Sequence, residues 1–190
     1  CSASASIMVI YHPVPDPIID PSMPQFCQGM DIVISADPGY ILYKWQSGQS
    51  TREISVIIPG IYTVTVTNGN NCEGVESVSV IENINPQSVI ESNQNPISLV
   101  EDQFIEFRDS SMGGSGAIVL WEWDYGENAI PAEMSFDTAH NKKFVKYEKF
   151  GFKTVTLCVT DDKGCTNCNS LPQFYVNGNG PKVDLTKEQG

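Results

Sequence analysis

The sequence predicts an all-β chain of two tandem β-sandwich domains, preceded by the closing strand of an upstream domain. Val, Ile, Thr, Tyr and Phe dominate the patterned segments, which is typical of strands. No amphipathic stretch of ten or more residues stands out, so we expect no helix. The 190 residues leave room for two domains of roughly 75 to 95 residues each.

An internal repeat predicts the first strand. Residues 1–10 read like residues 72–81, because each segment begins with Cys and then alternates apolar with polar or small residues. Ile7 and Val9 share the face of their cysteine, as the matching valines do in the second copy. We therefore expect residues 1–12 to be the closing strand of an upstream domain. Such a strand must pair with a neighbouring domain of the same polypeptide or with a copy of the protein.

The first complete domain is expected at residues 13–84. Its proline-rich start, residues 13–24, disfavours helix and central strand and predicts a stiff connector. In residues 62–67 apolar side chains alternate with three threonines, so one face should be buried and the other wet. The expected strands, separated by turns rich in Gly, Pro and Asn, are residues 31–35, 40–45, 52–58, 62–67 and 76–81.

The second domain is expected at residues 85–178. Residues 127–140 should form a longer insertion, and residues 179–190 a linker or tail. The expected strands are residues 97–100, 104–107, 119–124, 142–146, 152–160 and 173–176.

Charge and cysteine content narrow the partners and the compartment. The 23 acidic and 11 basic residues give a net charge of −12, which argues against nucleic acid and against an anionic membrane surface. Six cysteines in two small domains fit an oxidising, extracellular compartment. No apolar run is long enough to span a membrane.

The second domain carries a family resemblance. Residues 121–126 read Trp-Glu-Trp-Asp-Tyr-Gly, residues 150–157 read Phe-Gly-Phe-Lys-Thr-Val-Thr-Leu, and Val-Thr-Asp-Asp-Lys-Gly follows at residues 159–164. This set resembles the PKD (polycystic kidney disease) domain, which has a Trp-Asp-Phe-Gly-Asp-Gly-like strand and a Val-Thr-Leu-x-Val-Thr-Asp strand. Tyr125 departs from the family's Phe, and Glu-Asn replaces the Asp-Gly. The resemblance implies a β-sandwich.

The first domain resembles the immunoglobulin-like repeats of large surface and secreted proteins of Bacteroidetes. It has their Phe-Cys at residues 26–27 and their Pro-Gly-x-Tyr-x-Val-x-Val-Thr at residues 59–67. Their Trp-Ser-x-Gly-like turn reads Trp-Gln-Ser-Gly at residues 45–48, and their Asn-Gly-Cys reads Asn-Asn-Cys at residues 70–72. The resemblance implies export by type IX secretion to the bacterial cell surface. It also implies a role in adhesion or gliding motility.

The cysteines predict disulfides at two places. Cys27 precedes the first strand of its domain and Cys72 opens the last, so a bridge between them should close that domain at one end. In the second domain, Cys158 and Cys168 flank a tight turn and could face each other across it, which would leave Cys165 free. The sequence leaves open the alternative of Cys158 paired with Cys165, and it leaves open the state of Cys1.

We expect no catalytic site and no bound cofactor. Cys165 and Cys168 form a C-x-x-C, but neither a second ligand pair for zinc nor a helix start for redox chemistry accompanies them. His12 and His140 should be exposed, without a nucleophile or an orienting acid nearby. The chain is therefore not expected to be an enzyme.

A calcium ion is the one metal that the pattern allows. Asp124, Glu127 and Asp137 could gather around it, although calcium wants six or more oxygen ligands. Trp45 and Trp123 are expected in the cores rather than on a sugar-stacking surface.

The expected function is that of a structural or adhesive segment, a stalk or repeat in a large secreted or surface-anchored protein. The alternative is an accessory module of a secreted hydrolase that binds a substrate or carbohydrate. A cluster of exposed aromatic side chains on one face would favour the binding module, and a threonine-rich exterior would favour the stalk.

Overall fold

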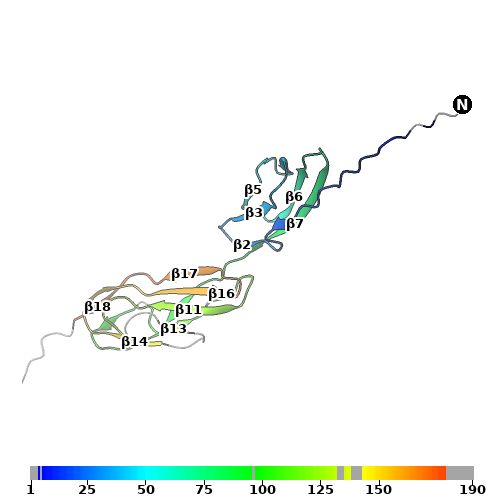
Figure 1. Cartoon of the computed structure of the whole chain (residues 1–190). Coiled ribbons are helices and arrows are strands. Elements are labelled where there is room, and N and C mark those ends of the chain that lie inside the picture. Colours follow the sequence, from blue (N-terminus) through cyan, green and yellow to red (C-terminus); the bar gives the residue numbers. More distant parts are fainter. Residues whose placement is uncertain (1–3, 5, 96, 132–134, 138–142, 179–190) are drawn as a thin grey trace, which may run out of the picture. The chain divides into compact units, whose positions relative to one another are not determined.

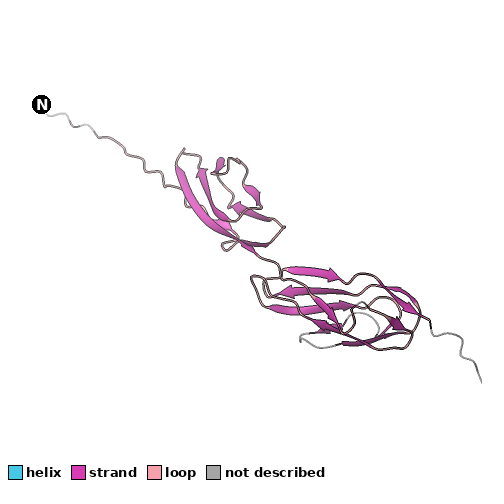
Figure 2. Ribbon diagram, turned by 180° about the vertical axis from the view of Figure 1, so that it is seen from behind, coloured by secondary structure: helices cyan, strands magenta, loops and turns pink. Residues whose placement is uncertain are grey.

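The computed structural model describes residues 4, 6–95, 97–131, 135–137 and 143–178, and only the backbone at residues 135–137. It divides into two compact units, Cys1–Glu82 (unit 1) and Asn83–Gly190 (unit 2) (Figure 1). Every regular element in the described ranges is a strand (Figure 2). The all-β prediction is confirmed.

Unit 1 is a sandwich of two sheets. The three-stranded sheet has the order β1-β3-β5 and the four-stranded sheet the order β2-β7-β6-β4. The strands are β1 (Ile19–Asp20), β2 (Gln25–Cys27), β3 (Ile32–Ala36), β4 (Leu42–Trp45), β5 (Glu53–Val56), β6 (Gly60–Thr67) and β7 (Glu73–Asn83).

The predicted alternation in β6 is confirmed. Val64 and Val66 are fully buried, while Thr63 and Thr65 face away from the core. Trp45 of β4 lies opposite Val64 in the antiparallel register and is 1% exposed. The two sheets share one core, made of Ile19, Phe26, Ile34, Ala36, Trp45, Ile54, Val56, Val64, Val66, Val78 and Val80.

Unit 2 contains three sheets around a second core. Their strand orders are β12-β14-β10-β8, β13-β11-β16-β17 and β15-β18-β9. The strands are β8 (Ile90–Ser92), β9 (Leu99–Val100), β10 (Ile105–Asp109), β11 (Ile118–Asp124), β12 (Ala129–Ile130), β13 (Ser135–Asp137), β14 (Lys143–Tyr147), β15 (Gly151–Lys153), β16 (Thr156–Asp161), β17 (Thr166–Ser170) and β18 (Phe174–Asn177). The buried cluster includes Phe107, Trp121, Trp123, Tyr125, Tyr147, Leu157 and Phe174.

The segment before unit 1's first strand lies partly against that unit. The amide of Asn68 donates a hydrogen bond to the Pro13 carbonyl, with Nδ2 and O 3.2 Å apart. A Cβ at Gly74 would lie 2.1 Å from the Pro15 carbonyl oxygen, so only glycine allows this approach. The proline-rich connector is therefore docked on the end of the sandwich.

The residues before that connector have no sheet partner in the described chain. Ile7 is 90% and Val9 84% exposed, and residues 6–11 form no strand. Their assignment as a closing strand of another domain stays a prediction.

Candidate functional site

Two carboxylates of unit 2, one buried and one half-buried, hold turns. Asp161 is 2% exposed, and its Oδ1 accepts the backbone N–H groups of Lys163 (3.0 Å) and Cys165 (2.9 Å). Asp109 Oδ1 accepts the backbone N–H of Ser111 at 2.9 Å, and its Oδ2 accepts the indole N–H of Trp121 at 2.8 Å. These contacts give both carboxylates a structural role. They accept hydrogen bonds from backbone and indole N–H groups that folding removes from water.

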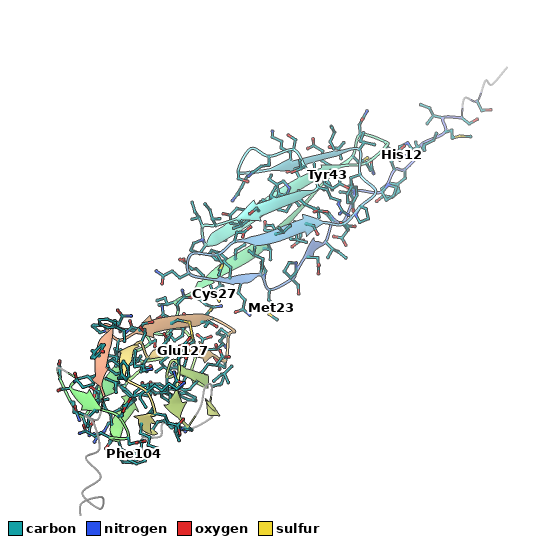
Figure 3. The ribbon with its side chains drawn as sticks, turned by 90° about the vertical axis from the view of Figure 1, so that its left-hand side faces the viewer. His12, Met23, Cys27, Tyr43, Phe104 and Glu127 are labelled. Atoms are coloured by element: carbon teal, nitrogen blue, oxygen red, sulfur yellow. A yellow bond between two sulfur atoms is a disulfide. The ribbon has the colours of Figure 1, made fainter. Side chains whose placement is uncertain are left out.

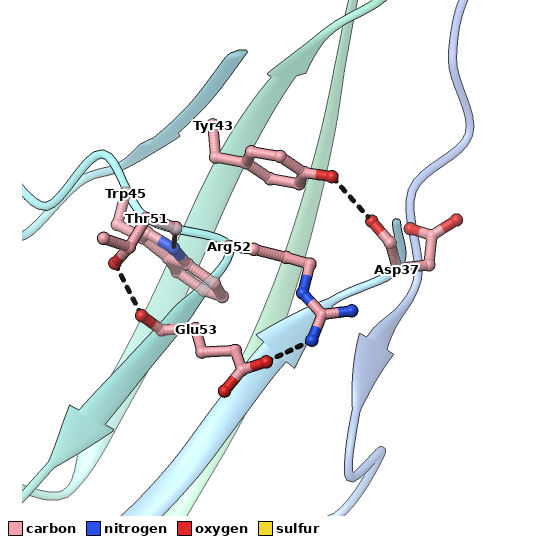
Figure 4. A network of polar contacts seen from close by, with 6 residues as sticks. All are labelled: Asp37, Tyr43, Trp45, Thr51, Arg52 and Glu53. Atoms are coloured by element: carbon pink, nitrogen blue, oxygen red, sulfur yellow. Dashed lines mark hydrogen bonds and ion pairs between the residues drawn. The ribbon is translucent and has the colours of Figure 1, made fainter. Parts of the chain in front are cut away.

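A polar network in unit 1 is equally structural (Figure 4). The indole N–H of Trp45 donates to the Thr51 carbonyl at 2.9 Å, and the Tyr43 hydroxyl donates to the Asp37 carbonyl at 3.2 Å. Burial, and then the neighbouring Asp37 carboxylate, raise the pKa of Tyr40 above its ordinary value. The network fixes the buried tryptophan and the turn beside it.

The residues predicted to bind calcium do not form a described cluster. Asp124 and Glu127 are exposed, and Asp124 Oδ1 accepts the Gly126 N–H at 2.8 Å. Glu127 lies on unit 2 (Figure 3). The backbone of Asp137 pairs with Trp121, but its side chain lies outside the described atoms. Among the described side chains, no three His, Cys, Asp or Glu residues gather as a metal site. Calcium here stays a prediction.

The structure contains one of the two disulfides considered for the hairpin of unit 2. Cys158 and Cys168 lie directly opposite each other on β16 and β17 and are bonded, with their Cα atoms 4.0 Å apart. Cys165, whose state the sequence left open, is fully buried and is itself disulfide-bonded. Because both cysteines of the C-x-x-C are oxidised, the motif offers no thiolate pair to a metal.

The expected bridge between Cys27 and Cys72 is wrong. Cys72 is a free, half-buried thiol, whereas Cys27 is disulfide-bonded. The reason is the position of β2 beside β7. Ile81 donates its N–H to the Pro24 carbonyl, so Cys27 lies near the far end of β7 from Cys72. The nine residues from Cys72 to Ile81 span about 30 Å of strand. This length keeps Cys72 well beyond the roughly 7 Å between Cα atoms that a disulfide with Cys27 would tolerate.

The histidines carry no described chemistry. His12 is exposed, on the segment that precedes the sandwich of unit 1 (Figure 3). His140 falls outside the residues that the structure describes.

Unit 2 buries a lysine beside a tyrosine, which the sequence did not lead us to expect. Lys153 is 6% exposed, its Nζ donates to the Glu127 carbonyl at 2.9 Å, and it lies 5.5 Å from the ring centroid of Tyr147. The Tyr147 hydroxyl donates to the Tyr125 carbonyl at 2.9 Å. Burial, followed by nearby Tyr125 and Asp124, raises the pKa of Tyr147 well above its ordinary value. The pair is satisfied internally and braces the core.

Exposed aromatic side chains gather on the β15-β18-β9 sheet. Phe152 of β15 lies opposite Tyr175 of β18, and their rings meet edge to face with centroids 5.0 Å apart. Phe152 is 67% and Tyr175 41% exposed. Phe150, just before β15, is 63% exposed, and its ring would contact a Cβ at Gly178. We call Phe150, Phe152 and Tyr175 the aromatic face.

Amide side chains border the aromatic face. Asn177 is exposed on the same side of β18 as Tyr175, and its Nδ2 donates to the Leu99 carbonyl at 3.1 Å. Gln173, also on that side, lines a groove of about 510 Å³ together with the amides Gln94 and Asn95. The groove's lining includes the carboxylate Glu91 and apolar side chains such as Leu171.

Sequence reasoning placed the tryptophans correctly and missed the aromatic face. Trp45 and Trp123 are both buried, as predicted. The signal for the face was nevertheless present. Phe150 and Phe152 are two residues apart, and in the adjacent pair Phe174-Tyr175 one ring of an alternating strand has to point outward.

Comparison with known proteins gives likeness at the level of domains. No protein-family model matches the chain. The PKD1 domain of Vibrio anguillarum Epp is 28% identical with a TM-score of 0.40, covering 52% of this chain and all of that domain. The PKD1 domain of the Vibrio cholerae metalloprotease PrtV is 28% identical with a TM-score of 0.39, covering 50% of this chain and 99% of that one.

A further similar structure comes from another kind of module. The fibronectin(III)-like modules of Clostridium thermocellum CbhA are 13% identical with a TM-score of 0.47, covering 86% of this chain and 95% of theirs. The described residues include no helix long and apolar enough to cross a bilayer. The fold class is thus set by the chain's own strands: two consecutive all-β units of the sandwich type.

Proposed function

We propose that the chain is a structural and interaction segment, a stalk or adhesive repeat of a large secreted or surface-anchored bacterial protein. The observation that carries the proposal is the presence of two β-sandwiches in succession, each with a core of its own. Tandem domains of this kind suit a spacer, because each closes its own hydrophobic surface and needs no partner for its stability.

The polar chemistry of the molecule supports the same role. Asp161, Asp109 and Trp45 use their polar atoms to hold turns and strands, and Cys158 is oxidised. Oxidised cysteines fit an extracellular location. The docked connector beside Gly74 would limit bending where the chain enters unit 1.

Strand pairing at residues 6–11 is part of the proposal. The matching residues of the internal repeat, Val78 and Val80, are buried in the unit 1 core. The parity shared by the two copies supports Ile7 and Val9 as core residues of another sandwich, in an upstream domain or in a copy of the protein. A strand shared between domains would join neighbouring units into one array.

The test is protease treatment of intact cells of the organism that makes the protein, followed by an immunoblot with antibody to this chain. We expect a band much larger than 20.9 kDa that disappears when protease is added outside the cells. A periplasmic marker must remain intact in the same sample. A band that resists external protease and is degraded only after lysis would contradict the proposal, including export by type IX secretion and a role in gliding.

A second candidate is favoured by the aromatic face. An accessory module that recruits a polysaccharide to a secreted hydrolase would need exposed aromatic rings, and unit 2 has them at Phe152 and Tyr175. A soluble protein of modest size in the same immunoblot would favour this candidate over the stalk.

A further inference from the structure

We propose that the aromatic face of unit 2, with the amide-lined groove beside it, binds an uncharged polysaccharide. The inference rests on the proposed role as an interaction segment and names its ligand. Two exposed rings on one small sheet, with a third just before it in the chain, are unusual for an ordinary surface, where large apolar side chains occur singly. Phe150, Phe152 and Tyr175 are therefore better explained as contacts for a ligand.

The geometry suits sugar rings. Phe152 and Tyr175 are fixed against each other at 5.0 Å, and their strands are held by the antiparallel register of β15 and β18. Sugar rings carry C–H groups on their faces and hydroxyls on their edges, so they pack on an aromatic ring and bind polar groups around it. A rigid aromatic contact loses little conformational entropy on binding.

The amides next to the rings can bind the hydroxyls. Asn177 lies on the outer side of β18, and Gln173, two residues before Tyr175, connects the aromatic face with the groove. Gln94 and Asn95 supply two further amides in that groove. Few polar groups around an apolar surface are the usual composition of a small-ligand site.

The charges around the aromatic face favour an uncharged ligand over an acidic one. The outward side chains of β9, β15 and β18 are Val100, Phe152, Tyr175 and Asn177, which include no Asp, Glu, Lys or Arg. Glu101 lies at the rim, where its Oε1 accepts the Phe150 N–H at 2.9 Å. With Glu91 in the groove and a net charge of −12 on the chain, an acidic polysaccharide would be repelled.

The experiment is affinity electrophoresis of the full chain in gels that contain one polysaccharide each. The neutral probes are hydroxyethylcellulose, soluble starch and laminarin, complemented by pull-down on insoluble chitin. The acidic probes are alginate and polygalacturonate, and gelatin serves as a protein probe. We expect retardation by at least one neutral polysaccharide and none by the acidic ones.

Variants locate the site. The double variant Phe152→Ala, Tyr175→Ala should weaken binding about tenfold or more. Aromatic side chains that a ligand covers on binding contribute most of the affinity of a small interface. Gln173→Ala should weaken it less. Phe144→Ala is the matched control, since Phe144 is also an exposed aromatic of unit 2 (58%) but lies on β14 in another sheet. Circular dichroism should show the native fold in every variant, because the substituted side chains are exposed.

Four outcomes would overturn the inference: no binding to any neutral probe, equal binding by the Phe152→Ala, Tyr175→Ala variant, equal loss in Phe144→Ala, or binding to acidic polysaccharides only. Gelatin binding that the double variant loses would assign the face to a protein ligand and would also overturn it. The protease test on intact cells is independent, so a stalk without a glycan ligand and a binding module without surface exposure can be told apart.

Discussion

Unit 1 and unit 2 each bury a hydrophobic core between β-sheets, but they differ in the side chains that they expose to solvent. In both, the strands that line the core bury side chains in it, with Trp45 in the first core and Trp123 in the second. The outer row of β6 in unit 1 carries threonines, whereas the β15-β18-β9 sheet of unit 2 carries aromatic rings. The buried row therefore specifies a sandwich, while the outer row can vary without changing the fold.

The first prediction tests whether the two cores are stable independently of each other. Trp45→Ala should lower the free energy of unfolding of unit 1, and Trp123→Ala that of unit 2, by about 3 to 5 kcal/mol each. Hydrogen exchange followed by mass spectrometry reports the two units individually. Loss of protection in both units by either variant would show that the cores are not independent.

The second prediction concerns the disulfide that braces one unit. Replacing Cys158 and Cys168 with serine should destabilise unit 2 by roughly 2 to 3 kcal/mol, because the bridge closes a short loop in the unfolded chain. Thermal unfolding measures the change. Cys72→Ser is the control, since that thiol is free, and an equal loss there would contradict the assignment.

A smaller effect should separate docked from open glycines in unit 1. Gly74→Ala places a methyl group 2.1 Å from the Pro15 carbonyl oxygen and should cost about 1 to 3 kcal/mol. Limited proteolysis should then cut the connector near residues 13–17 faster. At Gly69 nothing lies within 4 Å of an added Cβ, so Gly69→Ala should leave the cleavage rate unchanged.

The last effect depends on pH. The folded-state pKa of Tyr147 is raised from its ordinary value of 10.0. Below pH 10 the phenol is protonated in both states and its contribution to stability is complete. Above pH 10 only the unfolded state releases the proton, so stability falls as pH rises towards the folded-state value.

Tyr147→Phe tests this assignment. It removes the hydroxyl bond to the Tyr125 carbonyl and should cost about 1 kcal/mol at neutral pH. Denaturant unfolding should show a weaker loss above pH 10 than in the wild type. An unchanged pH profile in the variant would mean that another group titrates.

A strand could be predicted from the sequence where apolar and polar residues alternate along it. The stretch Tyr-Thr-Val-Thr-Val-Thr predicted β6 and its buried face correctly. β17 reads Thr-Asn-Cys-Asn-Ser and has no apolar row, so only its pairing with β16 makes it a strand. The expected strand at residues 152–160 is two strands, because β15 pairs with β18 while β16 pairs with β11 and β17.

The site was harder to predict than the fold. The order of strands did not reveal at which end of β7 the segment with Cys27 would lie, so the pairing with Cys72 failed. Phe152 and Tyr175 are far apart in sequence and become neighbours only through the register of two short strands. Long-range register was what the sequence alone could not supply.

β17 has a consequence for how the protein behaves at high concentration. It is the outermost strand of its sheet and carries no large apolar side chain. The unpaired backbone groups of an outermost strand can form hydrogen bonds with a strand of another molecule. Polar side chains disfavour this pairing, because it would bury little apolar surface. The disulfide between Cys168 and Cys158 also keeps β17 from separating from β16 and exposing the backbone edge of β16. Reducing agents should therefore promote fibrillar aggregation before they unfold the molecule.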